Sequence, residues 1–223
     1  MSERRFALLP VLTAVIGFVA PAGAQDKKDK PATKTGLDDT TSALMSHVEE
    51  AFKAKDYRRD PKHGDGKNPY DQISTKPGVL IGLDVWPGTR DKTVQYVRGV
   101  RPIWLGADGK EYTGKTVGWV GTGSVRLKAK PGYAVAGMKV HTDFGELSGL
   151  SLVFAKITET GLDMGDTEES KYYGHNDPNT ARKVVCTGAP ILGIHGLVAA
   201  NAKSHDFGLG LIVMGKDKKK KEK

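Results

Sequence analysis

Residues 131–140 read PGYAVAGMKV, and two other stretches of the chain repeat this pattern of a turn, an apolar strand and a central glycine. These stretches are PGVLIGLDV at residues 77–85 and GAPILGIHG at residues 188–196. Their central glycines, Gly82, Gly137 and Gly193, lie 55 and 56 residues apart. Self-similarity at a nearly constant spacing indicates a fold that is built from repeated structural units.

Each unit continues through a polar loop into a second apolar strand, which opens on Gly99, Gly149 or Gly208. Short apolar segments bounded by Gly, Pro and Asp are typical of strands, and many of those found here alternate apolar and polar residues. The predicted strands are 79–85, 94–105, 117–128, 134–141, 150–157, 191–198 and 209–214. The sequence therefore predicts an all-β domain.

Only one cysteine, Cys186, is present, so a hydrophobic core has to hold the domain without an intramolecular disulfide. Three sheet-forming units bury their apolar faces best by facing one another around a common axis. We therefore predict a β-prism with threefold pseudo-symmetry over residues 73–215.

A single helix is predicted in front of the strands, over residues 40–55. Leu44, Val48 and Phe52 fall on one helical face, and Asp38 and Asp39 are among the candidates for its N-cap. Residues 37–72 are interpreted as this helix followed by a turn-rich connector. One amphipathic helix cannot bury its own apolar face, so it either packs on the β domain or contacts a protein partner.

The first 24 residues are typical of a secretion signal. Arg4 and Arg5 precede an apolar run over residues 6–20, and the small residues 22–24 suit a signal peptidase. Residues 25–36 have the composition of a flexible linker. No other stretch is long and apolar enough to span a membrane. We expect an exported protein that is secreted, periplasmic or held at the cell surface.

The formal net charge of +8 resides mostly in the two ends of the chain. The Lys-rich tail, residues 216–223, carries +4, whereas residues 35–215 together carry only +1. Nucleic-acid binding requires basic residues clustered on a folded surface, so this distribution argues against a nucleic-acid partner. The tail is interpreted as a disordered extension, which leaves open an electrostatic contact with an anionic surface.

The threefold repeat over residues 73–215 resembles the jacalin-related (β-prism I) lectins. The resemblance also rests on residues 191–196, ILGIHG, followed by GLGL at 208–211, which are similar to the last repeat of that family. It implies binding of saccharides, usually without a metal ion. The family's Gly-x-x-x-Asp loop is replaced here by the longer segment 197–207, in which Asp206 is the counterpart of the aspartate and the glycine is missing.

If the three units are equivalent, their first loops meet at one end of the prism. Carboxylate and amide groups in these loops can fix sugar hydroxyl groups, and aromatic rings can stack on a sugar ring. The candidate carbohydrate-binding residues are Asn201, His205, Asp206, Phe207, Asp143 and Asp91. The partner expected for them is a glycan or a cell-surface polysaccharide.

Catalytic and metal-binding motifs are missing from the sequence. It has no Gly-x-Ser-x-Gly elbow and no His-Glu-x-x-His, and the acidic stretch 163–177 lacks the ligand spacing of an EF-hand. We therefore expect an exported carbohydrate-binding module that is not an enzyme and uses no metal or cofactor. A structural or adhesion domain without a sugar site is the alternative, and paired carboxylates distant in sequence leave a glycoside hydrolase open.

Overall fold

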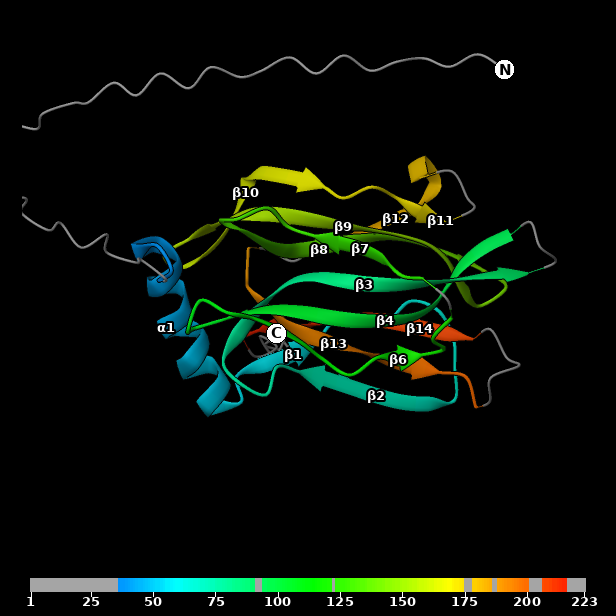
Figure 1. Ribbon diagram of the computed structural model, residues 1–223, viewed down its shortest axis with the longest axis horizontal. Coiled ribbons are helices and arrows are strands. Elements are labelled where there is room, and N and C mark those ends of the chain that lie inside the picture. The colour runs from blue at the N-terminus through cyan, green and yellow to red at the C-terminus, as the bar shows by residue number, and fades with distance from the viewer. Residues whose placement is uncertain are drawn as a thin grey trace, which may run out of the picture. The chain divides into compact units, whose positions relative to one another are not determined.

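The computed structural model of the chain describes residues 36–90, 94–121, 123–174, 178–185, 188–200 and 206–215. Within these ranges one α-helix, α1 (Asp39–Ala54), accompanies strands that form three antiparallel sheets (Figure 1). The strands of sheet I are β3 (Gly78–Arg90), β4 (Val94–Gly106), β5 (Glu111–Thr113), β6 (Val117–Gly118) and β7 (Val125–Lys128). Those of sheet II are β8 (Tyr133–Asp143), β9 (Glu146–Thr158), β10 (Gly161–Glu169), β11 (Tyr173–Gly174) and β12 (Arg182–Val185). Those of sheet III are β1 (Tyr57–Arg59), β2 (Asn68–Ile73), β13 (Ile191–Val198) and β14 (Phe207–Met214).

Each sheet is organised around one long hairpin, formed by β3–β4, β8–β9 or β13–β14. The strand orders are β5-β4-β3-β7, β10-β9-β8-β12 and β1-β14-β13-β2, so each hairpin is flanked by one further strand on either side. Sheets I and II take these flanking strands from the sequence that follows their hairpin, whereas sheet III takes them from residues 57–73. The predicted all-β, threefold architecture is thus confirmed.

The repeated central glycines occupy the same structural position in all three hairpins. Each follows a shift in the pairing register, because the residue before Gly82, Gly137 or Gly193 forms a bulge. A Cβ on Gly82 would collide with the carbonyl of Leu127 in β7, and one on Gly193 would collide with that of Gln72 in β2. The flanking strand therefore approaches too closely for a side chain at these two bulges.

The three sheets and α1 share one hydrophobic cluster. Each sheet contributes side chains with no exposed surface, among them Leu83, Ile103, Met138, Leu152, Ile194 and Leu211. The Trp104 indole Nε1–H of sheet I donates a buried hydrogen bond of 2.9 Å to the Leu192 carbonyl of sheet III. This bond satisfies a polar group inside the core, where an unpaired donor would be costly.

Helix α1 covers the end of the prism at which β4, β9 and β14 finish (Figure 1). The Asp38 carboxylate caps it by accepting from the Thr41 N–H at 2.7 Å, and Lys55 ends it in a left-handed conformation. Leu44 and Val48 are fully buried in the shared cluster. The apolar face of the helix thus packs on the β domain, so a protein partner would meet only its polar face.

The strand prediction differs from the structure in several places. Residues 117–128 were expected to form one strand, but β6 and β7 are separate. Gly118, the last residue of β6, and Gly123, in the connection to β7, adopt positive φ angles of 85° and 80°. Strands β5, β10, β11 and β12 fall outside the predicted strands. Strands β1 and β2 lie in the stretch interpreted as a connector, and they complete sheet III.

Several expectations fall outside the described residues: the secretion signal, the linker up to residue 35, Cys186 and the Lys-rich tail. Within the described ranges, no helix combines the length and hydropathy that crossing a membrane requires.

Candidate functional site

The three hairpins turn at the end of the prism opposite α1, which we call the loop end (Figure 1). Asp143 is exposed at the end of β8, and Asp206 is half-buried directly before β14. Phe207, the first residue of β14, is buried with 1% of its surface exposed. The other candidate residues, Asn201, His205 and Asp91, lie outside the described residues.

The β1–β2 connection, residues 60–67, links two of these loop regions. Its Asp65 N–H donates to the Gly145 carbonyl in the β8–β9 turn at 2.7 Å. Its Gly64 lies so close to the Phe207 carbonyl that a Cβ would overlap the oxygen. The β8–β9 turn and the start of β14 are therefore held on either side of the same short segment.

Two Asp-Phe dipeptides at the loop end have opposite environments. The Phe207 ring stacks on Tyr70 with ring centroids 6.1 Å apart and ring planes 16° apart. The Phe144 ring, in the β8–β9 turn, is 89% exposed. Phe207 therefore belongs to the core, whereas Phe144 presents its ring to solvent.

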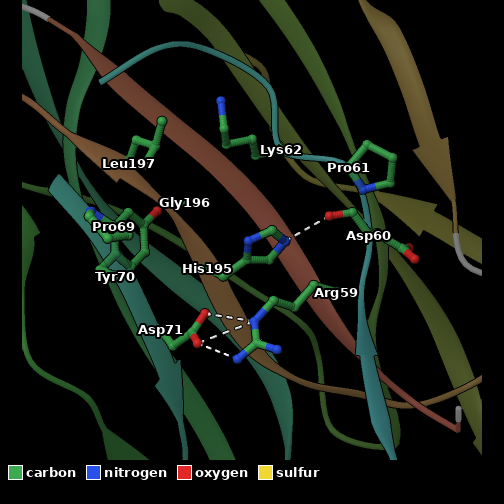
Figure 2. A pocket seen from close by; sticks show the side chains of 10 residues that line it. All are labelled: Arg59, Asp60, Pro61, Lys62, Pro69, Tyr70, Asp71, His195, Gly196 and Leu197. Atoms are coloured by element: carbon green, nitrogen blue, oxygen red, sulfur yellow. Dashed lines mark hydrogen bonds and ion pairs between the residues drawn. The ribbon is translucent and has the colours of Figure 1, made fainter. Parts of the chain in front are cut away.

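Next to the loop end, the outer face of sheet III is hollowed into an open depression of about 710 Å³ (Figure 2). The β1–β2 connection forms one side, β2 forms the other, and β13 forms the floor. The lining residues are Arg59, Asp60, Pro61, Lys62, Pro69, Tyr70, Asp71, His195, Gly196 and Leu197.

An ion pair crosses this depression from one edge strand of the sheet to the other. The Arg59 guanidinium on β1 donates through Nε and Nη2 to both carboxylate oxygens of Asp71 on β2 (Figure 2). The Nε distances are 3.1 and 3.2 Å, and hydrogen bonding to Asp71 raises the pKa of Arg59. The two side chains remain 50% and 45% exposed, so the pair stays accessible to a ligand.

His195 lies between the two sides of the depression, with its ring held in a fixed orientation. Its Nε2 lies 2.7 Å from the Asp60 carbonyl, which can only accept, so Nε2 carries the proton (Figure 2). In the neutral ring, Nδ1 is then an acceptor. The ring lies over Gly210 of β14, where a Cβ would overlap it in its present orientation.

Tyr70 forms part of the boundary between the depression and the loop end. Its hydroxyl donates to the Gly208 carbonyl at 2.9 Å, and burial raises the pKa of the phenol. A Cβ on Gly196 would lie 2.9 Å from the same hydroxyl oxygen and would overlap the Gly208 carbonyl. The absence of a side chain at Gly196 thus lets the backbone of β14 and the Tyr70 hydroxyl approach β13 closely.

The depression offers both hydrogen-bond donors and acceptors. Arg59 and Lys62 can donate, while the Asp71 carboxylate and His195 Nδ1 can accept. Within the described part of the chain, no three His, Cys, Asp or Glu side chains are grouped so as to hold a metal ion. This combination suits a neutral ligand with several hydroxyl groups.

None of the ten residues that line the depression was among the sequence candidates. Arg59, Lys62 and Asp71 come from the segment interpreted as a connector, and their proximity to β13 depends on pairing across more than a hundred residues. Only His195, Gly196 and Leu197 lie in stretches that the sequence had singled out, the third repeat and the loop that follows it.

Comparison with solved structures shows which fold this is. The mannose-binding lectin from champedak matches with a TM-score of 0.50 and 12% identity, over 71% of this chain and 96% of the lectin. The chain has the β-prism fold of the jacalin-related lectins. Malaysian banana lectin is also similar, with a TM-score of 0.49 and 14% identity over 72% of this chain and 99% of that one. Calystegia sepium agglutinin matches with a TM-score of 0.48 and 15% identity, over 72% of this chain and 97% of the agglutinin.

No family model and no curated protein sequence matches this chain. The likeness to jacalin-related lectins is therefore one of fold, at 12–15% identity for these three structures.

Proposed function

We propose that this protein is an exported carbohydrate-binding module that binds glycans at the depression of sheet III and the adjoining loop end, without catalysis. The observation that carries the proposal is the set of donors and acceptors, Arg59, Asp71 and His195, that lines this depression. Sugar hydroxyl groups both donate and accept hydrogen bonds, so Arg59, Asp71 and His195 together match their chemistry.

The β-prism fold agrees with this proposal, because the structure from champedak is a mannose-binding lectin with the same fold. Export agrees with the signal-like first 24 residues. Binding to an extracellular glycan or polysaccharide would place the depression, Asp206 and Asp143 in contact with sugar units.

The experiment that tests the proposal is a glycan-array screen of the chain at two ionic strengths. Polar contacts in a depression are screened little by salt, whereas attraction by the Lys-rich tail weakens as the Debye length shrinks to about 8 Å at physiological salt. We expect selective binding that survives added salt. Binding only to acidic glycans that is lost in salt would assign the interaction to the tail, and no binding would favour a structural or adhesion domain. Turnover of a polysaccharide would contradict the non-catalytic part of the proposal.

A further inference from the structure

Phe144 occupies a position in the β8–β9 hairpin that strongly disfavours a bulky residue. Asp143 and Glu146 pair across the strands, which leaves Phe144 and Gly145 as a two-residue turn with φ angles of 49° and 82°. Two successive positive φ angles are the signature of a type I′ turn, whose first central position favours Asn, Asp or Gly. A bulky side chain with positive φ is an outlier there.

Packing does not offset the energetic cost of this backbone conformation, because the Phe144 ring is 89% exposed and makes few contacts that could stabilise it. Phe207, by contrast, has its ring buried against Tyr70, so packing explains the aromatic residue at 207 but not the one at 144. Residues that break a local folding rule without a packing benefit are expected at functional positions.

The turn that carries Phe144 is anchored to the wall of the depression. The Asp65 N–H donates to the Gly145 carbonyl at 2.7 Å, and the Asp65 carboxylate fills the space that a Cβ on Gly145 would need. Asp65 is three residues from Lys62, which lines the depression, so their Cα atoms are at most about 10 Å apart. The turn that carries Phe144 is thus linked to the lining of the depression through the short segment 62–65.

The groups around the ring indicate which ligand it meets. Asp143 and Asp65 are exposed carboxylates on either side of the turn. They would repel an anionic membrane surface, but they accept hydrogen bonds from hydroxyl groups. An exposed aromatic face next to hydroxyl acceptors fits a pyranose ring, whose C–H face is apolar and whose edge is polar.

We infer that Phe144 stacks on a sugar unit of an oligosaccharide whose neighbouring unit lies in the depression of sheet III. This inference rests on the proposed function and deepens it, because it makes a chain of two or more sugar units the preferred ligand. The strained turn then holds the aromatic ring at a fixed place beside the site.

The test compares two variants against the native chain by calorimetric titration with an array-selected oligosaccharide and with its terminal monosaccharide. Phe144→Asn removes the ring and suits the type I′ turn, whereas Phe144→Tyr keeps an aromatic face. We expect Phe144→Asn to bind the oligosaccharide about tenfold more weakly, with unchanged monosaccharide affinity, and Phe144→Tyr to bind both as the native chain does.

Thermal unfolding is measured in parallel, and Phe144→Asn should melt no lower than the native chain. Native-like oligosaccharide binding by Phe144→Asn would overturn the inference and leave the proposed function standing. A lower melting temperature for Phe144→Asn would show that the ring stabilises the fold and would also overturn it. If the native chain binds no glycan, the proposed function fails first and the inference fails with it.

Discussion

Gly64 lies against the backbone carbonyl of Phe207, at a distance that leaves no room for a Cβ. Two other pairs repeat this relationship, since Gly118 lies against the Arg98 carbonyl and Gly174 lies against that of Ser148. The three glycines have φ angles of 88°, 85° and 145°. In each sheet the contact falls directly before a glycine within the second hairpin strand, Gly208, Gly99 or Gly149. The threefold symmetry therefore extends to the close backbone contacts near the loop end.

The first prediction concerns these contacts. Gly118→Ala adds both the strain of positive φ and a collision with the Arg98 carbonyl, so we expect a loss of about 3 kcal/mol or more in unfolding free energy. Gly132→Ala is the matched control, because Gly132 also has a φ of 80° but its Cβ would meet no atom within 4 Å. Gly132→Ala should lower the unfolding free energy by only about 1 kcal/mol. Equal losses in urea unfolding would show that the close contact has no structural role.

The second prediction concerns Asp84, which is 1% exposed and accepts hydrogen bonds from Arg101 and Arg126. Burial acts to raise the pKa of Asp84, but the hydrogen bonds from Arg126 and Arg101 outweigh it, so the pKa lies below the ordinary 3.8. The ionised carboxylate therefore contributes stability above pH 3.8, and this contribution is lost as the pH falls through the folded-state pKa.

We expect Asp84→Asn to lower the unfolding free energy by about 2 kcal/mol near neutral pH, discounted for the partial exposure of both arginines. The difference from the native chain should persist down to pH 3.8 and shrink below it. Urea unfolding across this range measures it. A difference that stays constant into the acid range would mean that the negative charge of Asp84 is not what stabilises the fold.

The third prediction compares two aspartates in similar ion pairs. Asp71 pairs with Arg59 in the depression, and Asp108, in the β4–β5 connection, pairs with Lys76 just before β3. The aspartate side chains are 45% and 41% exposed. Asp71→Asn should weaken glycan binding at least about tenfold, because a charged acceptor is lost at the proposed site. Asp108→Asn should leave the dissociation constant unchanged. Equal effects of the two variants would argue that only the overall charge matters.

The fourth prediction returns to the residue that the sequence singled out. Asp206→Ala should reduce glycan binding while the chain remains folded, because Asp206 stands directly before β14 beside the β1–β2 connection. Glu159→Ala, in the β9–β10 turn at the other end of β9, is the control for removing an exposed carboxylate. Calorimetry with the same glycan measures the affinity of both variants. If Asp206→Ala binds the glycan as tightly as the native chain does, Asp206 is not part of the binding site.

Much of the fold could be predicted because the repeated residues are those that the local backbone conformation of each hairpin requires. The glycines 82, 137 and 193 mark the bulges of the three hairpins, and β13 has the predicted bounds Ile191–Val198. Helix α1 was predicted within one residue at each end, since its apolar spacing and its cap are encoded locally.

Strands β1 and β2 could not be predicted in the same way. β1 has three residues, too few for an alternating pattern, and β2 contains Pro69, which is typical of turns but tolerated in an edge strand. Both pair with strands more than a hundred residues later in the chain. Their formation depends on tertiary contacts that no local pattern records.

The same limit applies to the site. The sequence placed Asp143 and Asp206 at one end of the prism, but it could not show that Arg59 reaches Asp71 across sheet III. The sequence has an Asp-Phe dipeptide at both 143–144 and 206–207, but only the structure shows that Phe144 is exposed and Phe207 is buried. Side-chain exposure depends on which face of which sheet a residue occupies, and that required the three-dimensional structure.

The most direct test of the central claim is an NMR titration of the isotope-labelled chain with the glycan that the array selects. The account predicts saturable shifts in the amide signals of Lys62, Gly196 and Leu197 around the depression. Thr160 and Gly215, which lie beside α1 at the opposite end, should not respond. Shifts confined to the α1 end, or no saturable shifts at all, would contradict the assignment of carbohydrate binding to sheet III.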